Sequence, residues 1–496
     1  MPPRDGSRTR AGHLPLSVIT DNMLDPTDWD EFRGQAHAML DDAIDHVRAL
    51  AAGPVWRPMP PDVRASFREP LPVEPSALAS VHAEFRERIL PYGSGNAHPR
   101  FVGWVQGGGN VAGMMADLLA AALDSNLGGR DHAPIEVERQ IVRWMRELFG
   151  FPAAASGILV TGTSLANWMA VVVAKTHALG RETRATGLGG AQLRAYASTA
   201  THQCVARALE LSGLGGDALV RISTGPDHRI DLAELRAAIA ADRARGLVPF
   251  FVAGNAGTVD IGAIDDLAAI AELAQRERLW FHVDGAFGAF AVLAPELRPR
   301  VAGLERADSI ACDFHKWLQV PYDAGLLLVR DGAAHAAAFA SDAAYLTRTS
   351  RGLAAGAPWP VDLGPDLSRG FRALKVWFTL KVHGLRRLGE VIAGTCALAQ
   401  HLAARIAREP ELELLAPVQL NIACFRYRHR DPGAIDAVNA EIVVDLQESG
   451  VAAPSTTRIG GALAIRVAIL NHRTRAADLD RIVDEILARG RAIGRS

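Results

Sequence analysis

The sequence predicts an α/β protein built on a mainly parallel β-sheet that helices cover on both faces. Between Gly157 and about Asp331, short continuous apolar runs alternate with stretches of helical periodicity. Continuous apolar runs are typical of strands that are buried on both sides, as in parallel sheets. Such sheets bind ligands beyond the carboxyl ends of their strands. The residues that follow each predicted strand are therefore the candidates for a functional site.

The elements of this central region follow from its apolar runs. Helices are predicted after the first two strands, over 165–178 and 264–277. Strands are predicted at 158–160, 248–253, 279–283, 309–314 and 325–329. Strands that alternate with helices in this way indicate a doubly covered sheet.

Helical segments are predicted before the sheet region. Helices are expected at 28–52, from an N-cap at Ser76 to about residue 90, and at 114–123 and 135–149. Residues 1–14 are rich in Arg, Gly and Pro and lack the apolar core of a secretory signal, so we expect a disordered extension there.

A small C-terminal α/β domain is predicted after the sheet region. A long helix over 371–407 leads to strands at 421–427 and 462–470 and helices at 434–449 and 476–489. The predicted divisions are an N-terminal extension and helical segment at 1–100, a large domain at 101–375 and a small domain at 376–496.

Composition excludes several classes of protein. A chain of 496 residues is too long for one core and predicts two or three domains. A net charge of −2 gives no general attraction to nucleic acid or to an anionic membrane, and we find no apolar run long enough to span a bilayer. Four scattered cysteines without metal-ligand spacing favour a reducing compartment, the cytoplasm, and no metal site; we interpret them as small buried residues.

The strongest chemical signal is Lys316, which follows the predicted strand at 309–314 in the run His315-Lys316-Trp317. Burial is expected to lower the pKa of this lysine and expose an amine that can form a Schiff base. Asp284 follows the strand at 279–283. An amine for the aldehyde and an anion for the ring nitrogen are what pyridoxal phosphate requires. The alternatives are a solvated lysine at a strand end and an aspartate that caps the next helix.

Four further motifs lie at strand ends. Thr163 and Ser164 open a helix where backbone N–H groups and hydroxyls can hold a phosphate, or where they simply cap it. His202 can stack on a flat cofactor, although a lone histidine is more often structural. Thr258 lies beside Gly257 in a loop that a ligand can approach closely, or in an ordinary turn. Ala286 is small enough to let a ring lie flat.

Residues 98–471 resemble the group II pyridoxal phosphate-dependent amino acid decarboxylases, which include the aromatic amino acid, glutamate, histidine and tyrosine decarboxylases. The motifs that carry the resemblance are His98-Pro99-Arg100-Phe101, His282-Val283-Asp284, His315-Lys316-Trp317 and Phe371-Arg372-Ala373-Leu374-Lys375-Val376-Trp377. The resemblance implies the fold type I architecture, pyridoxal 5'-phosphate as cofactor, a small amino acid as substrate, and a homodimer with the active site at the subunit interface.

The resemblance also implies roles for individual residues. Lys316 is the Schiff-base lysine, Asp284 pairs with the ring nitrogen, and His202 stacks on the ring and assists proton transfer. Thr163 and Ser164 hold the phosphate together with His315, Ala286 packs under the ring and Thr258 lines the cofactor pocket. Phe101 and Trp104 belong to the substrate pocket.

One loop departs from the family pattern. Animal and plant aromatic decarboxylases place a tyrosine in a mobile loop that returns the final proton, but 347–360 contains none, and Gly356 or a neighbour stands in its place. Family members without this tyrosine can let oxygen intercept the carbanion and release an aldehyde, ammonia and peroxide. Tyr345 lies upstream and does not match, so His202 or a residue of the other subunit is an alternative proton donor. The Gly- and Ala-rich loop at 348–358 is expected to act as a mobile lid.

The substrate remains open between alternatives. Phe101, Trp104 and Val105 indicate an aromatic or apolar side chain, unless they are core residues; Arg100 and Arg130 are possible contacts for an acidic one. The sequence therefore leaves three activities: decarboxylation to an amine, oxidative decarboxylation to an aldehyde, and pyridoxal phosphate chemistry without decarboxylation.

Overall fold

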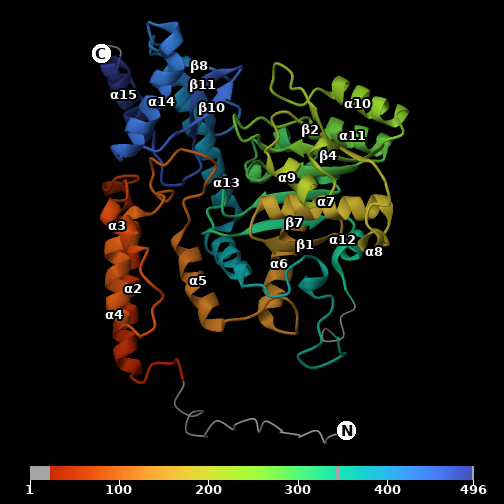
Figure 1. Ribbon diagram of the computed structural model, residues 1–496, viewed down its shortest axis with the longest axis horizontal. Helices are drawn as coiled ribbons and strands as arrows, with labels where there is room; N and C mark the ends of the chain where they lie inside the picture. The colour runs from red at the N-terminus through yellow and green to blue at the C-terminus, as the bar shows by residue number, and fades with distance from the viewer. Residues whose placement is uncertain (1–22, 342–346, 494–496) are drawn as a thin grey trace, which may run out of the picture. The chain divides into compact units, whose positions relative to one another are not determined.

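The computed structural model describes residues 23–341 and 347–493 and divides into two units (Figure 1). The helical unit comprises the described residues up to 49 together with 61–91. The sheet unit comprises 50–60 and the described residues from 92 onward. Each unit is described by itself.

The helical unit consists of α2 (Trp29–Ala49), α3 (Pro61–Ser66) and α4 (Leu78–Glu84), which continues into a π-helical turn at Phe85–Ile89. Asp28 caps α2, because its carboxylate accepts from the backbone N–H groups of the second and third residues that follow. The predicted cap at Ser76 is wrong, since Ala77 is the extended residue from which α4 starts. Asp42 on α2 joins the two longer helices through an ion pair with His82, at 3.3 Å.

The sheet unit contains a seven-stranded sheet with the order β1-β7-β6-β5-β4-β2-β3. All neighbours from β3 to β6 are parallel, and only β7 runs against the others. The strands are β1 (Ser156–Val160), β2 (Leu193–Ser198), β3 (Leu219–Ile222), β4 (Val248–Asn255), β5 (Trp280–Asp284), β6 (Ser309–Asp313) and β7 (Gly325–Val329). The predicted mainly parallel sheet is confirmed, whereas β2 and β3 went unpredicted because Arg194 and Arg221 interrupt their apolar runs.

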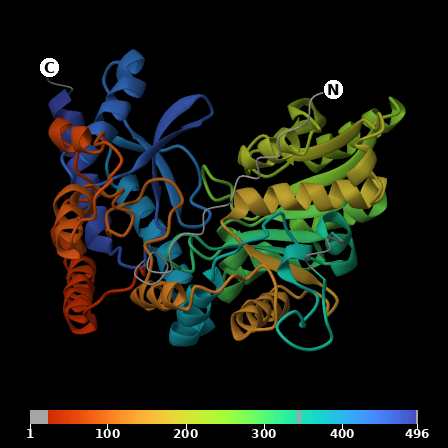
Figure 2. The same cartoon turned by 60° about the horizontal axis from the view of Figure 1, so that its bottom comes forward.

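Helices cover both faces of this sheet (Figures 1 and 2). On one face pack α7 (Thr163–Leu179), α9 (Cys204–Leu211) and α12 (Gly332–Phe339); on the other pack α6 (Ala133–Leu148), α10 (Leu232–Ala244), α11 (Leu267–Glu277) and α13 (Arg372–Ala407). Side chains along each strand alternate between the two cores, with Phe251 in one and Val252 in the other. A short helix, α8 (Thr183–Thr186), follows α7, and α5 (Val111–Leu123) packs against α13.

A second, antiparallel sheet lies in the C-terminal part of the sheet unit. Its order is β10-β11-β9-β8, with β8 (Leu412–Leu414), β9 (Ile422–Tyr427), β10 (Ser455–Ile459) and β11 (Ala462–Ala468). Residues of α14 (Ile435–Glu448), α15 (Ala476–Ile493) and the end of α13 form its core. The long predicted helix is confirmed in position but is interrupted at Gly384, where φ is 68°.

The carboxyl edge of the large sheet positions the site. Asn255, Asp284 and Asp313 are the last residues of β4, β5 and β6, three strands that lie side by side. The turn from β1 into α7 reaches the same edge at Gly162, because β1 runs in the same direction. In the part of the chain that the structure describes, no helix is long and apolar enough to cross a membrane.

Candidate active site

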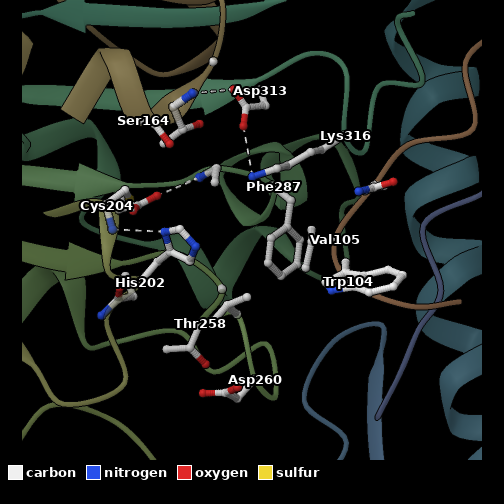
Figure 3. Close-up of a pocket in the computed structure, with 18 of the residues that line it drawn as sticks. Trp104, Val105, Ser164, His202, Cys204, Thr258, Asp260, Phe287, Asp313 and Lys316 are labelled. Carbon is white, nitrogen blue, oxygen red and sulfur yellow. Dashed lines mark hydrogen bonds and ion pairs between the residues drawn. The ribbon is translucent and has the colours of Figure 1, made fainter. Parts of the chain in front are cut away.

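A cavity of about 440 Å³ opens at the carboxyl edge of the large sheet (Figure 3). Its wall includes nine of the ten residues that the sequence singled out: Trp104, Thr163, Ser164, His202, Thr258, Asp284, Ala286, His315 and Lys316. These residues come from segments more than 200 positions apart, and the sheet topology brings them together. Phe101 is the one that does not line this cavity.

Lys316 points into the cavity from the turn after β6 (Figure 3). Its side chain is 20% exposed, and its Nζ lies 3.0 Å from Oδ2 of Asp313. Burial alone lowers the pKa of the Lys316 amine, but the ion pair with Asp313 and the charge of Asp284 together raise that pKa above its usual value. The predicted lowering of the pKa is therefore wrong for the protein without cofactor, because a buried carboxylate compensates the ammonium ion.

Asp313 is a site residue that the sequence reasoning missed. Besides the pair with Lys316, its carboxylate accepts from the backbone N–H of Thr163 at 2.7 Å and lies 3.6 Å from Nε2 of His315. The three-residue spacing to Lys316 just beyond a strand could have revealed it, since both side chains then share one turn. Asp313 thus ties the lysine to the turn that opens α7.

The start of α7 fits a phosphate group. Within the described residues, the Thr163 hydroxyl is buried and has no hydrogen-bond partner, while the neighbouring Ser164 is exposed to the cavity. His315 accepts a hydrogen bond at Nδ1 from the backbone of Ala324, so its Nε2 is the protonated nitrogen of the neutral ring. Two hydroxyls, an imidazole N–H and a helix N-terminus provide the donors that a phosphate dianion requires.

Asp284 fits the ring nitrogen of the cofactor. The residue is 6% exposed and lines the cavity. Its Oδ1 accepts from the backbone N–H of Ala286 at 3.2 Å, and its Oδ2 accepts from Nδ2 of Asn167 at 2.9 Å. It does not cap the next helical turn, whose N-cap is Phe287. Among the described residues no cation forms an ion pair with this carboxylate, so a buried negative charge faces the cavity without a positive partner.

His202, Ala286 and Thr258 form the flat part of the cavity wall. His202 is exposed to the cavity and accepts at Nδ1 from the backbone N–H of Cys204 at 3.2 Å, which leaves Nε2 free to act on a ligand. Ala286 is half-buried. Thr258 is buried, and its hydroxyl accepts from the backbone N–H of Ala263, which closes the loop after β4.

Phe101 and Trp104 lie differently from each other. Phe101 is buried, 5% exposed, and lines a neighbouring cavity of about 390 Å³. Trp104 lies between the two cavities, is 52% exposed and has a backbone φ of 52°. The two rings pack against each other with centroids 5.8 Å apart. Trp104 therefore presents an apolar surface to the cavity that Lys316 enters (Figure 3).

The arginines in and around the site differ from those expected. Arg100 donates to the carbonyl of Val451, and the guanidinium of Arg130 stacks on Trp359; neither lines the cavity. Among the described residues, the arginine in the cavity wall is Arg466 of β11, which is 3% exposed and donates to the carbonyl of Asp260 at 3.1 Å. No sequence signal pointed to Arg466 or Asp260, since only the packing of the two sheets brings them to the site.

The tyrosine-free segment at 347–360 does not line the cavity of its own chain. Arg348 forms a two-pronged ion pair with Asp362 at 2.6 and 2.7 Å, and Trp359 is buried beside it. Tyr345 lies outside the described residues. Tyr322 does line the cavity, with its ring packed against His315 at a centroid distance of 4.2 Å and an interplanar angle of 33°.

The fold and this site define a pyridoxal phosphate-dependent enzyme of the α/β class. Residues 60–428 match the pyridoxal-dependent decarboxylase conserved domain. The chain is 31% identical over 467 residues to an aromatic-L-amino-acid decarboxylase from Bacillus atrophaeus, covering 92% of this chain and 95% of that relative. It is 31% identical over 421 residues to an L-2,4-diaminobutyrate decarboxylase from Rhizobium meliloti, covering 84% of this chain and 83% of that relative.

Solved structures agree with this assignment. The crystal structure of Oryza sativa TDC with PLP and tryptamine superposes with a TM-score of 0.86 at 25% identity, covering 95% of this chain and all of that one. The chain belongs to the pyridoxal-dependent decarboxylase family, with pyridoxal phosphate as its cofactor. It is a carboxy-lyase of amino acids, and the predicted family, fold type I architecture and cofactor are confirmed.

Proposed function

We propose that this enzyme decarboxylates an aromatic L-amino acid to the corresponding amine and carbon dioxide. The observation that carries the proposal is the cavity wall itself, where Trp104, Val105 and Phe287 provide an apolar surface on the same side as Lys316. Aromatic surfaces of this kind favour a flat apolar side chain over a charged one. The names of relatives support the choice, among them tyrosine decarboxylase 3 from Petroselinum crispum, 27% identical to this chain.

The proposed roles of the chain's residues follow from the geometry. Bound pyridoxal phosphate supplies an electron-accepting ring for the electron pair of the bond that breaks. Lys316 supplies the amine that holds the cofactor's aldehyde carbon. Asp284 holds the proton on the ring nitrogen, His202 and Ala286 cover the two faces of the ring, and Thr258 closes the pocket beside them. Thr163, Ser164 and His315 hold the phosphate, while Trp104 contacts the substrate side chain; Phe101 supports Trp104 from behind.

A screen of the common L-amino acids with product identification tests the proposal. We expect carbon dioxide and an amine from tyrosine, tryptophan or phenylalanine, and no amine from Lys316→Ala under the same conditions. The matched control is Lys175→Ala, because Lys175 is half-buried, donates to the carbonyl of Ser212 and does not line the cavity. Release of carbon dioxide from glutamate alone would overturn the aromatic substrate and point instead to Arg466.

A second candidate is oxidative decarboxylation to an aldehyde. The absence of tyrosine from residues 347–360 favours this reaction, because another group must then donate the proton to the former α-carbon. The balanced reaction consumes the amino acid, oxygen and water, and releases the aldehyde, carbon dioxide, ammonia and hydrogen peroxide. A phenylacetaldehyde synthase from Arabidopsis thaliana is 26% identical to this chain.

Tyr322 and His202 are the donors in the cavity wall that can decide between these products. Burial raises the pKa of the Tyr322 phenol, so its proton is retained at neutral pH. We expect Tyr322→Phe to increase the ratio of peroxide to amine if Tyr322 returns the proton. One peroxide for each carbon dioxide already in the unmodified enzyme would make the aldehyde the main product.

The proposed assembly is a homodimer in the cytoplasm. Its support is a set of exposed apolar side chains on α5 and the adjoining part of α13: Val111, Leu118, Leu119, Leu123, Val382 and Leu385. Helices α5 and α13 pack against each other, and exposed apolar patches mark protein interfaces. Four cysteines without a disulfide are compatible with a reducing compartment.

A further inference from the structure

An unbroken chain of buried hydrogen bonds extends from Asp284 away from the cavity. Asn167 of α7 donates through Nδ2 to Oδ2 of Asp284 at 2.9 Å. Oδ1 of Asn167 lies 2.8 Å from Nε2 of His282, and Nδ1 of His282 lies 2.8 Å from the hydroxyl of Ser309. The indole Nε1 of Trp280 donates to the same hydroxyl oxygen at 2.8 Å. Three elements, α7, β5 and β6, thus contribute to one line of polar groups.

All members of this chain are removed from solvent. Asn167 is 1% exposed, His282 and Ser309 are 0% exposed, and Trp280 is 6% exposed. Burying this many polar groups costs free energy unless every donor and acceptor is paired. Nδ2 of Asn167 also donates to the sulfur of Cys204 at an N···S distance of 3.1 Å, so both amide hydrogens have partners. Each side-chain polar atom of Asn167, His282 and Ser309 therefore has a partner within the protein.

The Asp284 end of the chain determines the direction of each hydrogen bond. A carboxylate accepts, so the Asn167 amide presents its NH₂ group to Asp284 and its Oδ1 to Nε2 of His282. Nε2 therefore carries the proton of the neutral imidazole, and Nδ1 accepts from the hydroxyl of Ser309. The same hydroxyl oxygen accepts from the indole of Trp280, which can only donate. The direction is then the same at every step, from Trp280 to the carboxylate.

The neutral form of His282 agrees with its surroundings. Burial lowers the pKa of the His282 imidazole to about 4, although the charge of Asp284 acts in the opposite sense. A rotated Asn167 amide would set its oxygen against the carboxylate of Asp284, where two acceptors repel each other. An ionised Asp284 therefore requires this direction, and the hydrogen bond from Trp280 to Ser309 is compatible with it.

We propose that Asn167, His282 and Ser309 are positioning residues that hold Asp284 as an ionised carboxylate aimed at the ring nitrogen of the cofactor. Hydrogen bonds to charged groups are about twice as strong as neutral ones, so the Asn167 amide stabilises the charge and restricts rotation of the carboxylate. The inference rests on the proposed role of Asp284. It extends the site to residues that never touch the cofactor, and it explains why polar Asn and Ser occupy the core beside β5.

The test compares two cofactors on the apoprotein. Pyridoxal phosphate and its 1-deaza analogue, which has carbon in place of the ring nitrogen, are titrated against wild type, Asn167→Leu and Ser309→Ala, and dissociation constants are measured by fluorescence. We expect Asn167→Leu, which loses a charge-assisted hydrogen bond, to bind pyridoxal phosphate about tenfold or more weakly. Ser309→Ala, which loses the hydrogen bond that orients His282, should also bind it more weakly, and neither variant should change much toward the analogue. Asn167→Asp keeps the side-chain shape, replaces the donor by an acceptor, and should give the same selective loss if Asn167→Leu does not fold.

Two further variants of the enzyme serve as controls. Asn439→Leu removes an equally buried amide that bonds backbone groups of Tyr427 on β9 and Ile435 on α14, and should leave both affinities unchanged. Asp284→Asn should lose affinity for pyridoxal phosphate alone. Equal losses for both cofactors in the Asn167 and Ser309 variants, with a selective loss in Asp284→Asn, would refute the positioning role by itself. Equal losses in Asp284→Asn as well would refute the proposed role of Asp284.

Discussion

At the scale of single residues, the ion pair between Lys316 and Asp313 controls the reactivity of the site before the cofactor arrives. An amine attacks a carbonyl only in its neutral form. The raised pKa of Lys316 keeps the neutral fraction small at neutral pH, because burial is outweighed by the two nearby carboxylates. Asp313 thus stabilises the buried ammonium ion of Lys316 and lowers the reactivity of its amine.

Replacing Asp313 by Asn should therefore move the pH dependence of cofactor incorporation to lower pH. Below the lysine pKa the neutral fraction rises tenfold per pH unit, so each unit by which the pKa falls makes incorporation about tenfold faster at neutral pH. Stopped-flow absorbance of apoprotein mixed with pyridoxal phosphate measures the rate. Asp323→Asn is the matched control, since Asp323 pairs with Arg372 instead. An unshifted pH profile in Asp313→Asn would contradict the assignment.

Thr163 offers a second test at this scale. Thr163→Val keeps the volume of the side chain and removes the buried hydroxyl that lacks a protein partner. We expect affinity for pyridoxal phosphate to fall by about 1–3 kcal/mol, the usual cost of a lost hydrogen bond to a charged group, while affinity for pyridoxal stays the same. Thr176→Val, at the other end of α7, should change neither value in equilibrium dialysis. Equal loss for both ligands would exclude a phosphate contact.

At the scale of elements, the site depends on how closely the segment before α5 approaches the turn that carries Lys316. A Cβ atom on Gly107 would lie 2.3 Å from the carbonyl oxygen of His315 and 2.5 Å from that of Lys316. Only a hydrogen atom fits there. The adjacent residues Trp104, Val105 and Gln106 line the cavity, so this contact positions the apolar wall against the lysine.

Gly107→Ala should displace this wall. We expect a loss of about 1–3 kcal/mol in the free energy of unfolding, as for other overpacked positions, together with a higher KM. Gly394→Ala on α13 is the control, because nothing lies within 4 Å of its added methyl group and alanine favours a helix. Urea unfolding and steady-state kinetics measure both effects. A KM equal to that of wild type would show that the wall does not contact the substrate.

At the scale of the whole molecule, the exposed apolar side chains of α5 and α13 are the surface that assembly would cover. Leu118 on α5 is 55% exposed and Val382 on α13 is 61% exposed. A charge introduced at the centre of such an interface opposes association, because it would be buried without a partner.

Leu118→Asp or Val382→Asp should therefore convert the protein to monomers in sedimentation velocity experiments. Leu211→Asp provides the control, since Leu211 is 67% exposed on α9, outside this surface. Lower activity of the monomer would further indicate that the site is completed by the other subunit. A dimer that persists in both variants would place the interface elsewhere.

The sequence alone determined the sheet, the cofactor and the residues at its strand ends. Strands such as β5 and β6 are continuous apolar runs, and Asp284 and Lys316 follow them directly, so local pattern was sufficient. Strands β2 and β3 were missed because Arg194 and Arg221 interrupt their apolar runs. The tertiary structure alone decided which distant groups surround those residues. Arg466 reaches the cavity from the second sheet, Asp313 reverses the expected pKa shift of Lys316, and Asn167 joins Asp284 across 117 positions of sequence. Ion pairs and hydrogen bonds depend on distances in space, and only the packing of helices and strands sets those distances.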